Sequence, residues 1–368
     1  TVFKRYSIVS AEAGVRYFVL GSFMSGILLF GILFIYAFFG SSNFSVIKIV
    51  SVLTSNLLTH CYVEQYNIIV NLGFFLITIF LLFKSGCIPF HIWIINTYDG
   101  APTTSTVIFT LLPKLAIFCF LIRWVSSLGD FSINITEILF FLGIFTTLVG
   151  TFFTLFQKRF KIFLIYSSIS QIGFLFVSLG INSVESVINC YFFLIIYLFS
   201  SILTWSYFCF HHFLQFNLDK YYFKRISSNL FFSHFSSIFK TTKFSIFIVL
   251  VLFSFAGIPP LAGFMAKFLV ILSAISLNYF YESIFLILIS SLSALNYVRL
   301  IKIFVFEVEE KLVKSFTIYH SQPYLLNNFI DSFFLIATIC FFLLFFLFFY
   351  PSGLLLFCQY LIFSSQEI

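Results

Sequence analysis

Long apolar runs recur along the chain, and short charged or turn-rich stretches separate them. The hydrocarbon core of a bilayer is about 30 Å thick and needs about 20 apolar residues per helix, so each run predicts a membrane-spanning helix. We predict about nine transmembrane helices, near residues 14–39, 66–86, 102–124, 136–156, 160–180, 187–212, 244–275, 280–306 and 331–350. The pattern therefore predicts an all-α polytopic membrane protein.

The spans predict a single membrane domain over residues 14–350, with loops at residues 213–243 and 307–330. Residues 1–13 are expected to be the remnant of a preceding span, and residues 351–368 a C-terminal tail.

Two stretches rich in glycine and proline interrupt the apolar segments: SGCIPFHIWIINTYDGAPTT at residues 85–104 and FAGIPPLAGFMAKF at residues 255–268. Proline removes a backbone donor and loosens the helical hydrogen-bond ladder, so we predict two discontinuous helices. Broken helices persist in a membrane only where they pack in protein or line a wet cavity. The breaks therefore indicate polar sites inside the membrane.

The composition excludes a soluble domain, because 61% of the residues are hydrophobic and only 9% are charged. The seven cysteines show no C-x-x-C pair, and most lie in apolar runs, where they are interpreted as small buried hydrophobic residues. The six histidines show no pairing across two spans that would hold a haem. We therefore expect no cofactor, no metal site and no redox group on this chain.

Most lysines and arginines fall in the N-terminal segment and in alternate loops, whereas Lys48 and Arg123 fall on the other side of the predicted membrane. Positive loops mark the inner side, so the N-terminus is predicted to face the positive-inside compartment and the C-terminus the opposite one. The net charge of +7 is thereby explained by topology, and no nucleic acid partner is expected.

Three lysines, Lys84, Lys114 and Lys267, remain inside the predicted spans. A lysine near the bilayer centre costs roughly 3 kcal/mol or more, so it usually pairs, faces water or carries an ion or proton. Lys84 lies near the end of its span, where its side chain could instead extend to the interface. Lys114 lies ~18 Å along a helix from Pro102, at mid-membrane, and Lys267 follows the second break.

Few acidic groups are placed to pair with these lysines. Glu12, just before the first full span, is the best candidate, although an exposed carboxylate at a helix start is the alternative. His91 could relay a proton or could be a structural histidine. Burial disfavours the charged form of a lysine and a nearby carboxylate favours it, so the pattern favours a membrane proton or cation conductor.

Three segments carry a resemblance to a known family. FKSGCIPFHIWIINTYDGAPTTSTVIFTLLPKLAIF (83–118), QKRFKIFLIYSSISQIGFLFVSL (157–179) and SFAGIPPLAGFMAKF (254–268) are similar to motifs of the antiporter-like subunits of respiratory complex I. SAEAGVRYFVLGSFMSGILLFG (10–31) resembles the start of a span in the same family. The resemblance covers residues 10 to about 306 and implies an antiporter-like fold in the mitochondrial inner membrane, with the N-terminus on the matrix side and the C-terminus on the intermembrane-space side.

The resemblance implies a proton path. Glu12 and Lys84 would form a switchable ion pair, and breaking it would change the proton affinity of Lys114, from which the proton passes to Lys267. The chain would do no redox chemistry itself, because NADH:ubiquinone electron transfer elsewhere in the complex drives the path. Implied partners are the other membrane-arm subunits and lipids.

The sequence departs from the family pattern at several points. Gln171 stands where the family usually has histidine, which removes one titratable group. Lys161 matches a common lysine at a membrane boundary and is interpreted as an anchor. Bacterial members have additional preceding spans, so we expect a separate chain to supply them, or their loss.

Two other hypotheses stay open on the sequence. The chain could be a subunit of a related monovalent cation/proton antiporter, because the lysine spacing does not separate the two classes. It could also be a scaffold that has kept the fold and stopped pumping.

Overall fold

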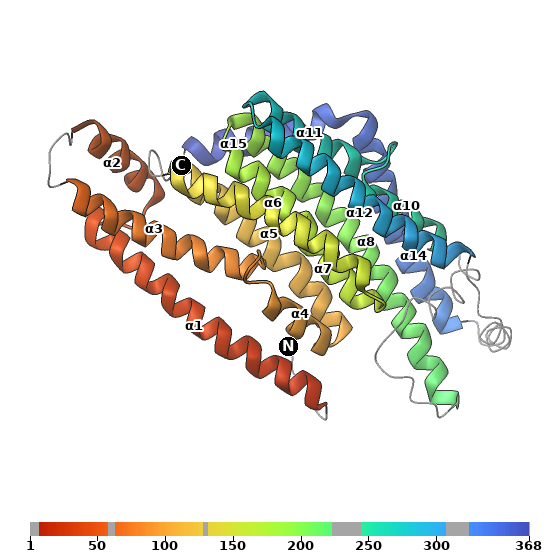
Figure 1. Ribbon diagram of the computed structural model, residues 1–368. Helices are drawn as coiled ribbons and strands as arrows, with labels where there is room; N and C mark the ends of the chain where they lie inside the picture. Colours follow the sequence, from red (N-terminus) through yellow and green to blue (C-terminus); the bar gives the residue numbers. More distant parts are fainter. Residues whose placement is uncertain (1–6, 58–62, 128–131, 223–243, 307–323, 368) are drawn as a thin grey trace.

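The computed structural model describes residues 7–57, 63–127, 132–222, 244–306 and 324–367, and all its regular elements are α-helices. These are α1 Ile8–Phe39, α2 Phe44–Leu57, α3 Val63–Ser85, α4 Ile92–Gly100, α5 Thr103–Ser127, α6 Ser132–Phe156, α7 Phe160–Ile181, α8 Val184–Tyr222, α10 Phe244–Ala256, α11 Ala262–Ser276, α12 Phe280–Phe306, α14 Tyr324–Phe349 and α15 Pro351–Glu367. Most run roughly along one common direction, as Figure 1 shows.

Every predicted span falls on a helix or on a broken pair of helices, with α10 and α11 together covering the span near 244–275. Within the described residues, six helices are individually long and apolar enough to cross a membrane, and α3, α10 and α11 are shorter apolar helices. The prediction of an all-α polytopic membrane protein is confirmed.

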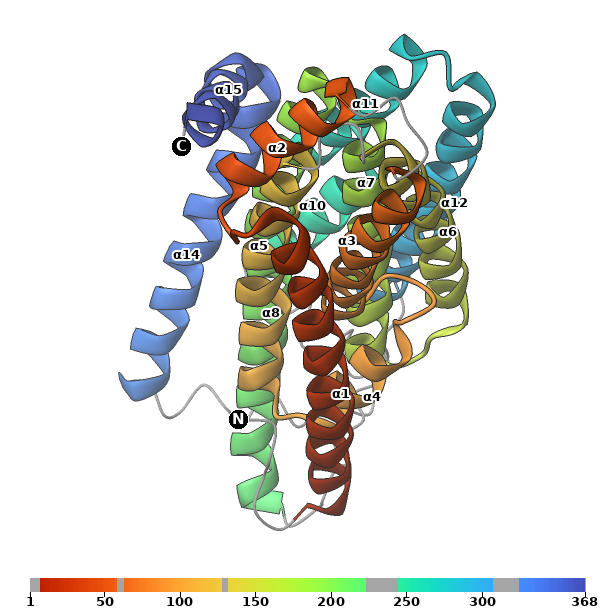
Figure 2. The same cartoon turned by 90° about the vertical axis from the view of Figure 1, so that its left-hand side faces the viewer.

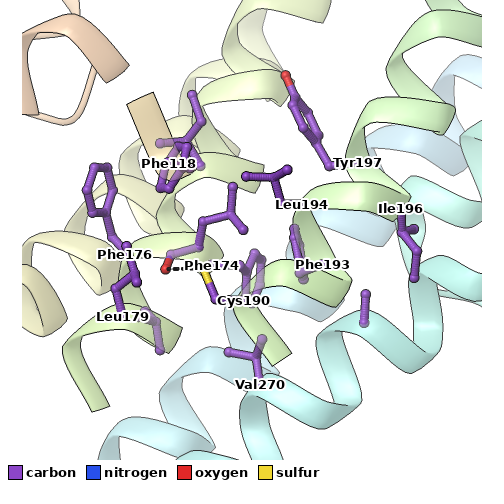
Figure 3. Packing of buried hydrophobic residues seen from close by; sticks show 14 of the residues in the cluster. Phe118, Phe174, Phe176, Leu179, Cys190, Phe193, Leu194, Ile196, Tyr197 and Val270 are labelled. Atoms are coloured by element: carbon purple, nitrogen blue, oxygen red, sulfur yellow. Dashed lines mark hydrogen bonds between the residues drawn. The ribbon is translucent and has the colours of Figure 1, made fainter. Parts of the chain in front are cut away.

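Helix α7 lies at the centre of the bundle, because 89% of its most apolar stretch is buried inside the structure. The corresponding share for α1, at the periphery, is 17%. In Figure 1 α1 lies along the left-hand edge of the bundle, the side that faces the viewer in Figure 2. Gly173 allows α6 to pack closely on α7, since a Cβ there would stand 2.6 Å from the Thr147 backbone nitrogen. Figure 3 shows the core beside α7, where Phe118, Phe174, Phe193 and Val270 meet from four helices.

The two predicted breaks end their helices in the same way. Gly86 and Gly257 adopt left-handed φ angles of +82° and +78°, which L side chains rarely adopt. The next amide closes each helix: Cys87 N donates to Leu82 O over 3.0 Å, and Ile258 N donates to Phe253 O over 3.2 Å. Each break is therefore an ordered helix end.

Several element boundaries differ from the prediction. Helix α1 begins at Ile8, so residues 8–13 belong to the first span's own helix, and residues 1–6 lie outside the described part. Helix α8 continues to Tyr222, inside the predicted loop, and α14 begins at Tyr324, inside the other. Much of both predicted loops, residues 223–243 and 307–323, lies outside the described residues.

Three helices were not predicted, namely α2, α4 and α15. The predicted C-terminal tail forms α15, which is bent by 92° from α14 and so lies across the bundle end. Helix α4 continues the course of α3 after the first break, as Figure 1 shows.

Several basic residues of the described part gather at one end of the bundle. The turn between α6 and α7 carries Lys158 and Arg159, and Arg299 Nη1 of α12 donates to Leu155 O near the end of α6 over 2.6 Å. We call this end, with exposed Arg299 and Lys302, the basic-residue face. Helix α2, which carries Lys48, lies at the opposite end of the bundle in Figure 1.

Candidate intramembrane lysine site

Lys114 lies deep in the bundle, on α5, and is 4% exposed. Its ammonium donates to Ser168 Oγ over 2.9 Å and to Tyr197 Oη over 3.1 Å. The same amine lies 5.5 Å from the centroid of the Tyr197 ring, a distance typical of a cation–π contact. Lys114 is thus held by hydroxyl groups of α7 and α8 and by an aromatic face, with no described carboxylate paired to it.

Lys267 lies beside the second break, on α11, and is 5% exposed. Its amine donates to Phe255 O over 2.6 Å and to Ala256 O over 3.3 Å, the last carbonyls of α10 before Gly257. Carbonyls at a helix C-terminus carry partial negative charge and favour a cation. The break therefore makes room for the lysine, and Ser293 Oγ of α12 accepts a third bond over 3.3 Å.

At the first break, the lysine lies towards a neighbouring helix and not against the carbonyls of the helix end. Lys84 lies in the last turn of α3, but the carbonyl of Phe83 accepts a bond from Trp93 Nε1 over 2.9 Å. The Lys84 amine points instead towards α1, 5.5 Å from the centroid of the Tyr17 ring. Lys84 is half-buried and lines a cavity of about 40 Å³ that Lys114 also lines. The structure thereby brings the first two lysines to one cavity.

A second cavity, of about 10 Å³, lies beside Lys267, and Tyr197 and Gln171 line it as well. Gln171 is 3% exposed, and its Nε2 has no hydrogen-bond partner among the described residues. Tyr297 of α12 is buried beside this cavity, with its ring 5.8 Å from that of Phe255, which lines the cavity. Tyr197 therefore touches Lys114 on one side and the Lys267 cavity on the other.

Tyr197, Tyr297, Ser168 and Ser293 were not predicted from the sequence. Hydroxyl residues inside apolar helices commonly bond to their own helix, so nothing in the pattern distinguishes these. Ser168 and Tyr197 lie 54 and 83 residues from Lys114 in sequence.

Glu12 is exposed and forms an ion pair with Arg16, four residues later on the same helix. A Cβ added at Gly21 of α1 would stand 4.0 Å from the Lys84 amine, and Gly21 lies nine residues beyond Glu12, which is about 13 Å along a helix. In this structure Glu12 pairs with Arg16, its local i,i+4 partner, and not with Lys84, so the switchable pair between Glu12 and Lys84 stays a prediction.

His91 packs in the first break against the ring of Phe153, at 6.5 Å between ring centroids, and it lines neither cavity. The roles of Glu12 and His91 in a proton path stay predictions. Within the described residues no three His, Cys, Asp or Glu side chains lie close enough to hold a metal ion.

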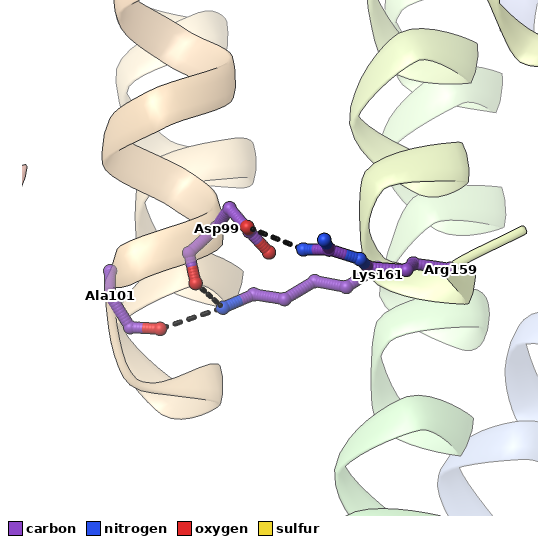
Figure 4. Close-up of polar contacts among 4 residues, drawn as sticks. All are labelled: Asp99, Ala101, Arg159 and Lys161. Atoms are coloured by element: carbon purple, nitrogen blue, oxygen red, sulfur yellow. Dashed lines mark hydrogen bonds and ion pairs between the residues drawn. The ribbon is translucent and has the colours of Figure 1, made fainter. Parts of the chain in front are cut away.

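Lys161 fixes the end of the first broken helix. Its Nζ donates to Asp99 O over 3.0 Å and to Ala101 O over 2.7 Å, and Arg159 Nη1 pairs with Asp99 Oδ2 at 3.2 Å. Figure 4 shows both basic side chains reaching from the start of α7 to the end of α4. These contacts tie α4 to α7 at the basic-residue face and support the interpretation of Lys161 as an anchor.

Known proteins are similar to this chain in sequence and in fold. The family model described as NADH:quinone oxidoreductase/Mrp antiporter, TM, matches residues 1–295. NADH-ubiquinone oxidoreductase chain 2 of Marchantia polymorpha is 30% identical over 96% of this chain, which spans 66% of that relative. The protein of the same name from Metridium senile is 32% identical over 83% of this chain, which spans 73% of its length.

A solved chain of the membrane-bound sulfane sulfur reductase, an archaeal respiratory membrane complex, has the same fold, with a TM-score of 0.79 at 20% identity. The match covers 98% of this chain and 67% of that one. Since the family model covers most of the chain, the chain belongs to the NADH:quinone oxidoreductase/Mrp antiporter family of multi-pass membrane proteins.

Proposed function

We propose that the chain is a proton-translocating membrane-arm subunit of mitochondrial respiratory complex I. The proton would pass from Lys84 to Lys114 across their shared cavity, and from Lys114 through Tyr197 and Gln171 to Lys267. The observation that carries the proposal is the double contact of Tyr197, with the Lys114 amine and with the Lys267 cavity. The energy would come from NADH:ubiquinone electron transfer elsewhere in the complex.

The chemistry of the site supports proton transfer. A buried amine without a paired carboxylate changes its charge state readily when another charge approaches. Hydroxyl and amide groups between two such amines can pass or hold a proton through water. A lysine relay of this kind needs no cofactor on this chain.

The names of the relatives favour complex I. Within complex I, the residue at position 267 favours subunit 2. A lysine at position 267 argues against subunit 4, whose corresponding segment ends in glutamate. The chain would thus be a subunit of the proton-translocating NADH:ubiquinone reductase of the mitochondrial inner membrane, with its basic-residue face towards the matrix.

The proposal includes the other membrane-arm subunits as partners, and a separate chain that supplies the preceding spans of the longer relatives. Such a chain would pack against α1, because only 17% of the most apolar stretch of that helix is buried. Intact-mass measurement of the subunit from the purified complex tests this. One polypeptide as long as the relatives would contradict a separate chain.

Replacing Tyr197 with phenylalanine is expected to slow proton translocation about tenfold or more. The change removes one hydrogen bond to a charged amine, and such bonds contribute roughly 1.5–3 kcal/mol. Tyr191→Phe is the matched control, because Tyr191 is also buried on α8 but lines neither cavity. Proton uptake by sealed vesicles, normalised to assembled complex, measures the effect. Equal rates for the two variants would remove Tyr197 from the path.

The second candidate function is a subunit of a cation/proton antiporter, since the matching family model includes Mrp antiporters. On a native gel of solubilised membranes, the chain is expected to migrate with NADH-oxidising activity. Migration in an assembly without that activity would favour the antiporter. Vesicle assays with Na⁺ or K⁺ gradients would then identify the transported ion.

A further inference from the structure

Pro113 lies inside α5, directly before Lys114, and it changes the hydrogen bonding of the helix at that point. Proline has no N–H, so the carbonyl four residues earlier, that of Phe109, receives no helical hydrogen bond from residue 113. The carbonyl is not left bare, because the Tyr98 hydroxyl of α4 donates to it over 3.0 Å. A side chain from a neighbouring helix therefore replaces the donor that proline removes.

Tyr98 is fixed in this position by its aromatic neighbours. It is 5% exposed, and its ring stacks on the Phe109 ring, at 6.3 Å between centroids and 19° between planes. The Trp93 ring meets it edge-on, at 6.4 Å between centroids. Tyr98 and Phe109 both line the cavity that Lys84 and Lys114 share. The bond from Tyr98 to the Phe109 carbonyl is thus part of the wall of that cavity.

The second break shows what uncovered carbonyls do to a nearby lysine. There the Lys267 amine donates to Phe255 O and Ala256 O, at the end of α10. A carbonyl oxygen accepts hydrogen bonds and cannot donate one, so it holds an ammonium proton without passing it on. The Lys114 amine donates instead to two hydroxyl groups, of α7 and α8, and a hydroxyl group can both accept and donate. The two buried lysines therefore differ in whether their partners can pass a proton.

We propose that Tyr98 is a positioning residue that covers the Phe109 carbonyl, so that this carbonyl does not trap the proton carriers of the cavity. The cavity, of about 40 Å³, has room for water, since one water needs about 10–15 Å³. The Lys84 ammonium gives one proton to this water, and the Lys114 amine receives one from it. Tyr98 neither gains nor loses a proton, and no electron moves. The inference rests on the proton-translocation function proposed above.

Replacing Tyr98 with phenylalanine is expected to slow proton translocation about tenfold or more, because a bare carbonyl binds an ammonium through a strong, charge-assisted hydrogen bond. The change keeps the ring and leaves Phe109 O without its donor at the cavity wall. Proton uptake by sealed vesicles, normalised to assembled complex, measures the effect. Tyr191→Phe is again the matched control, because Tyr191 is buried and lines neither cavity. Equal rates for the two variants would overturn the proposal.

Adding Pro113→Ala to Tyr98→Phe separates a covered carbonyl from a packing contact. Alanine restores the N–H at position 113, which can donate to Phe109 O within the helix. The double variant is therefore expected to translocate protons faster than Tyr98→Phe alone. A tyrosine that only packs, or one that relays the proton itself, would not be rescued in this way. A double variant no faster than Tyr98→Phe would overturn the proposal.

Assembly provides a second test if Tyr98→Phe does not yield an assembled complex. The bare buried carbonyl would then be the cause of the loss, and the added Pro113→Ala would supply the missing donor. The double variant is expected to return to the complex on native gels of detergent extracts. Its absence from the complex would also overturn the proposal.

Lys114→Met separates failure of this inference from failure of the proposed function. If Lys114→Met leaves translocation unchanged, the proton path through the lysines is wrong. If Lys114→Met abolishes translocation and Tyr98→Phe does not alter it, the path stands and the role of Tyr98 alone is wrong.

Discussion

Replacing Lys114 with methionine is expected to reduce proton translocation by about 10²-fold or more, which is the usual contribution of a positioned proton-transfer group. Methionine has a similar length and is unbranched, so it can fill the same space without a titratable group. The side chain is 4% exposed and makes two hydrogen bonds through its amine. Removing a buried charge relieves its desolvation cost, so the complex is expected to assemble normally.

The measurement is proton uptake by sealed vesicles together with NADH:ubiquinone reductase turnover, both normalised to assembled complex. Lys48→Met is the matched control, because Lys48 is exposed on α2, outside both cavities. The control is expected to pump at the wild-type rate. Unchanged pumping and turnover in Lys114→Met would identify the chain as a scaffold that has kept the fold without the transport.

The spans and both breaks could be predicted because their signals are local. An apolar run of about 20 residues and a Gly–Pro interruption are visible in a short window of sequence. Helix α2 escaped prediction because its 14 residues, with Lys48 inside, are too short to span a bilayer. Helix α15 was not predicted for a similar reason, because it is also short. The sequence after Tyr350 does not distinguish a helix that lies across the end of the bundle from an irregular tail.

The deep lysines could also be predicted, because a charge inside an apolar run is visible without a structure. Their partners could not. The acceptors of the Lys114 amine come from α7 and α8, and Ser293 reaches Lys267 from α12. Which of many serines and tyrosines faces a given lysine depends on helix rotation and packing, which composition and periodicity do not fix.

The contact between Glu12 and Lys84 that the resemblance implies is not present in this structure. Glu12 and Arg16 are spaced i,i+4, the spacing at which opposite charges pair on one helix. That local pair needs no tertiary structure, whereas a pair with Lys84 requires α1 and α3 to align at a particular height.

Replacing Gly263 with alanine is expected to destabilise the second broken helix by about 3 kcal/mol or more, at the upper end of overpacking costs. Gly263 lies in the first turn of α11, where its backbone packs on the last turns of α10. An added Cβ would stand 2.7 Å from the Ser254 carbonyl carbon and closer still to its oxygen. A backbone carbonyl cannot rotate away as a side chain can, so α10 and α11 must separate. That separation would also disturb the carbonyls of Phe255 and Ala256 that hold Lys267.

The expected result is a lower thermal midpoint for the complex, or loss of this subunit from it, on native gels of detergent extracts. Gly26→Ala is the matched control, since Gly26 is an exposed helical residue of α1 with no atom within 4 Å of an added Cβ. Helix propensity favours alanine by about 0.8–1.0 kcal/mol inside a helix such as α1, so the control is expected to be neutral or slightly stabilising. A large loss of stability in Gly263→Ala alone would therefore report the close contact at the break. Normal assembly and stability of Gly263→Ala would mean that α10 and α11 are not packed in this way, and the placement of Lys267 against the end of α10 would fail with it.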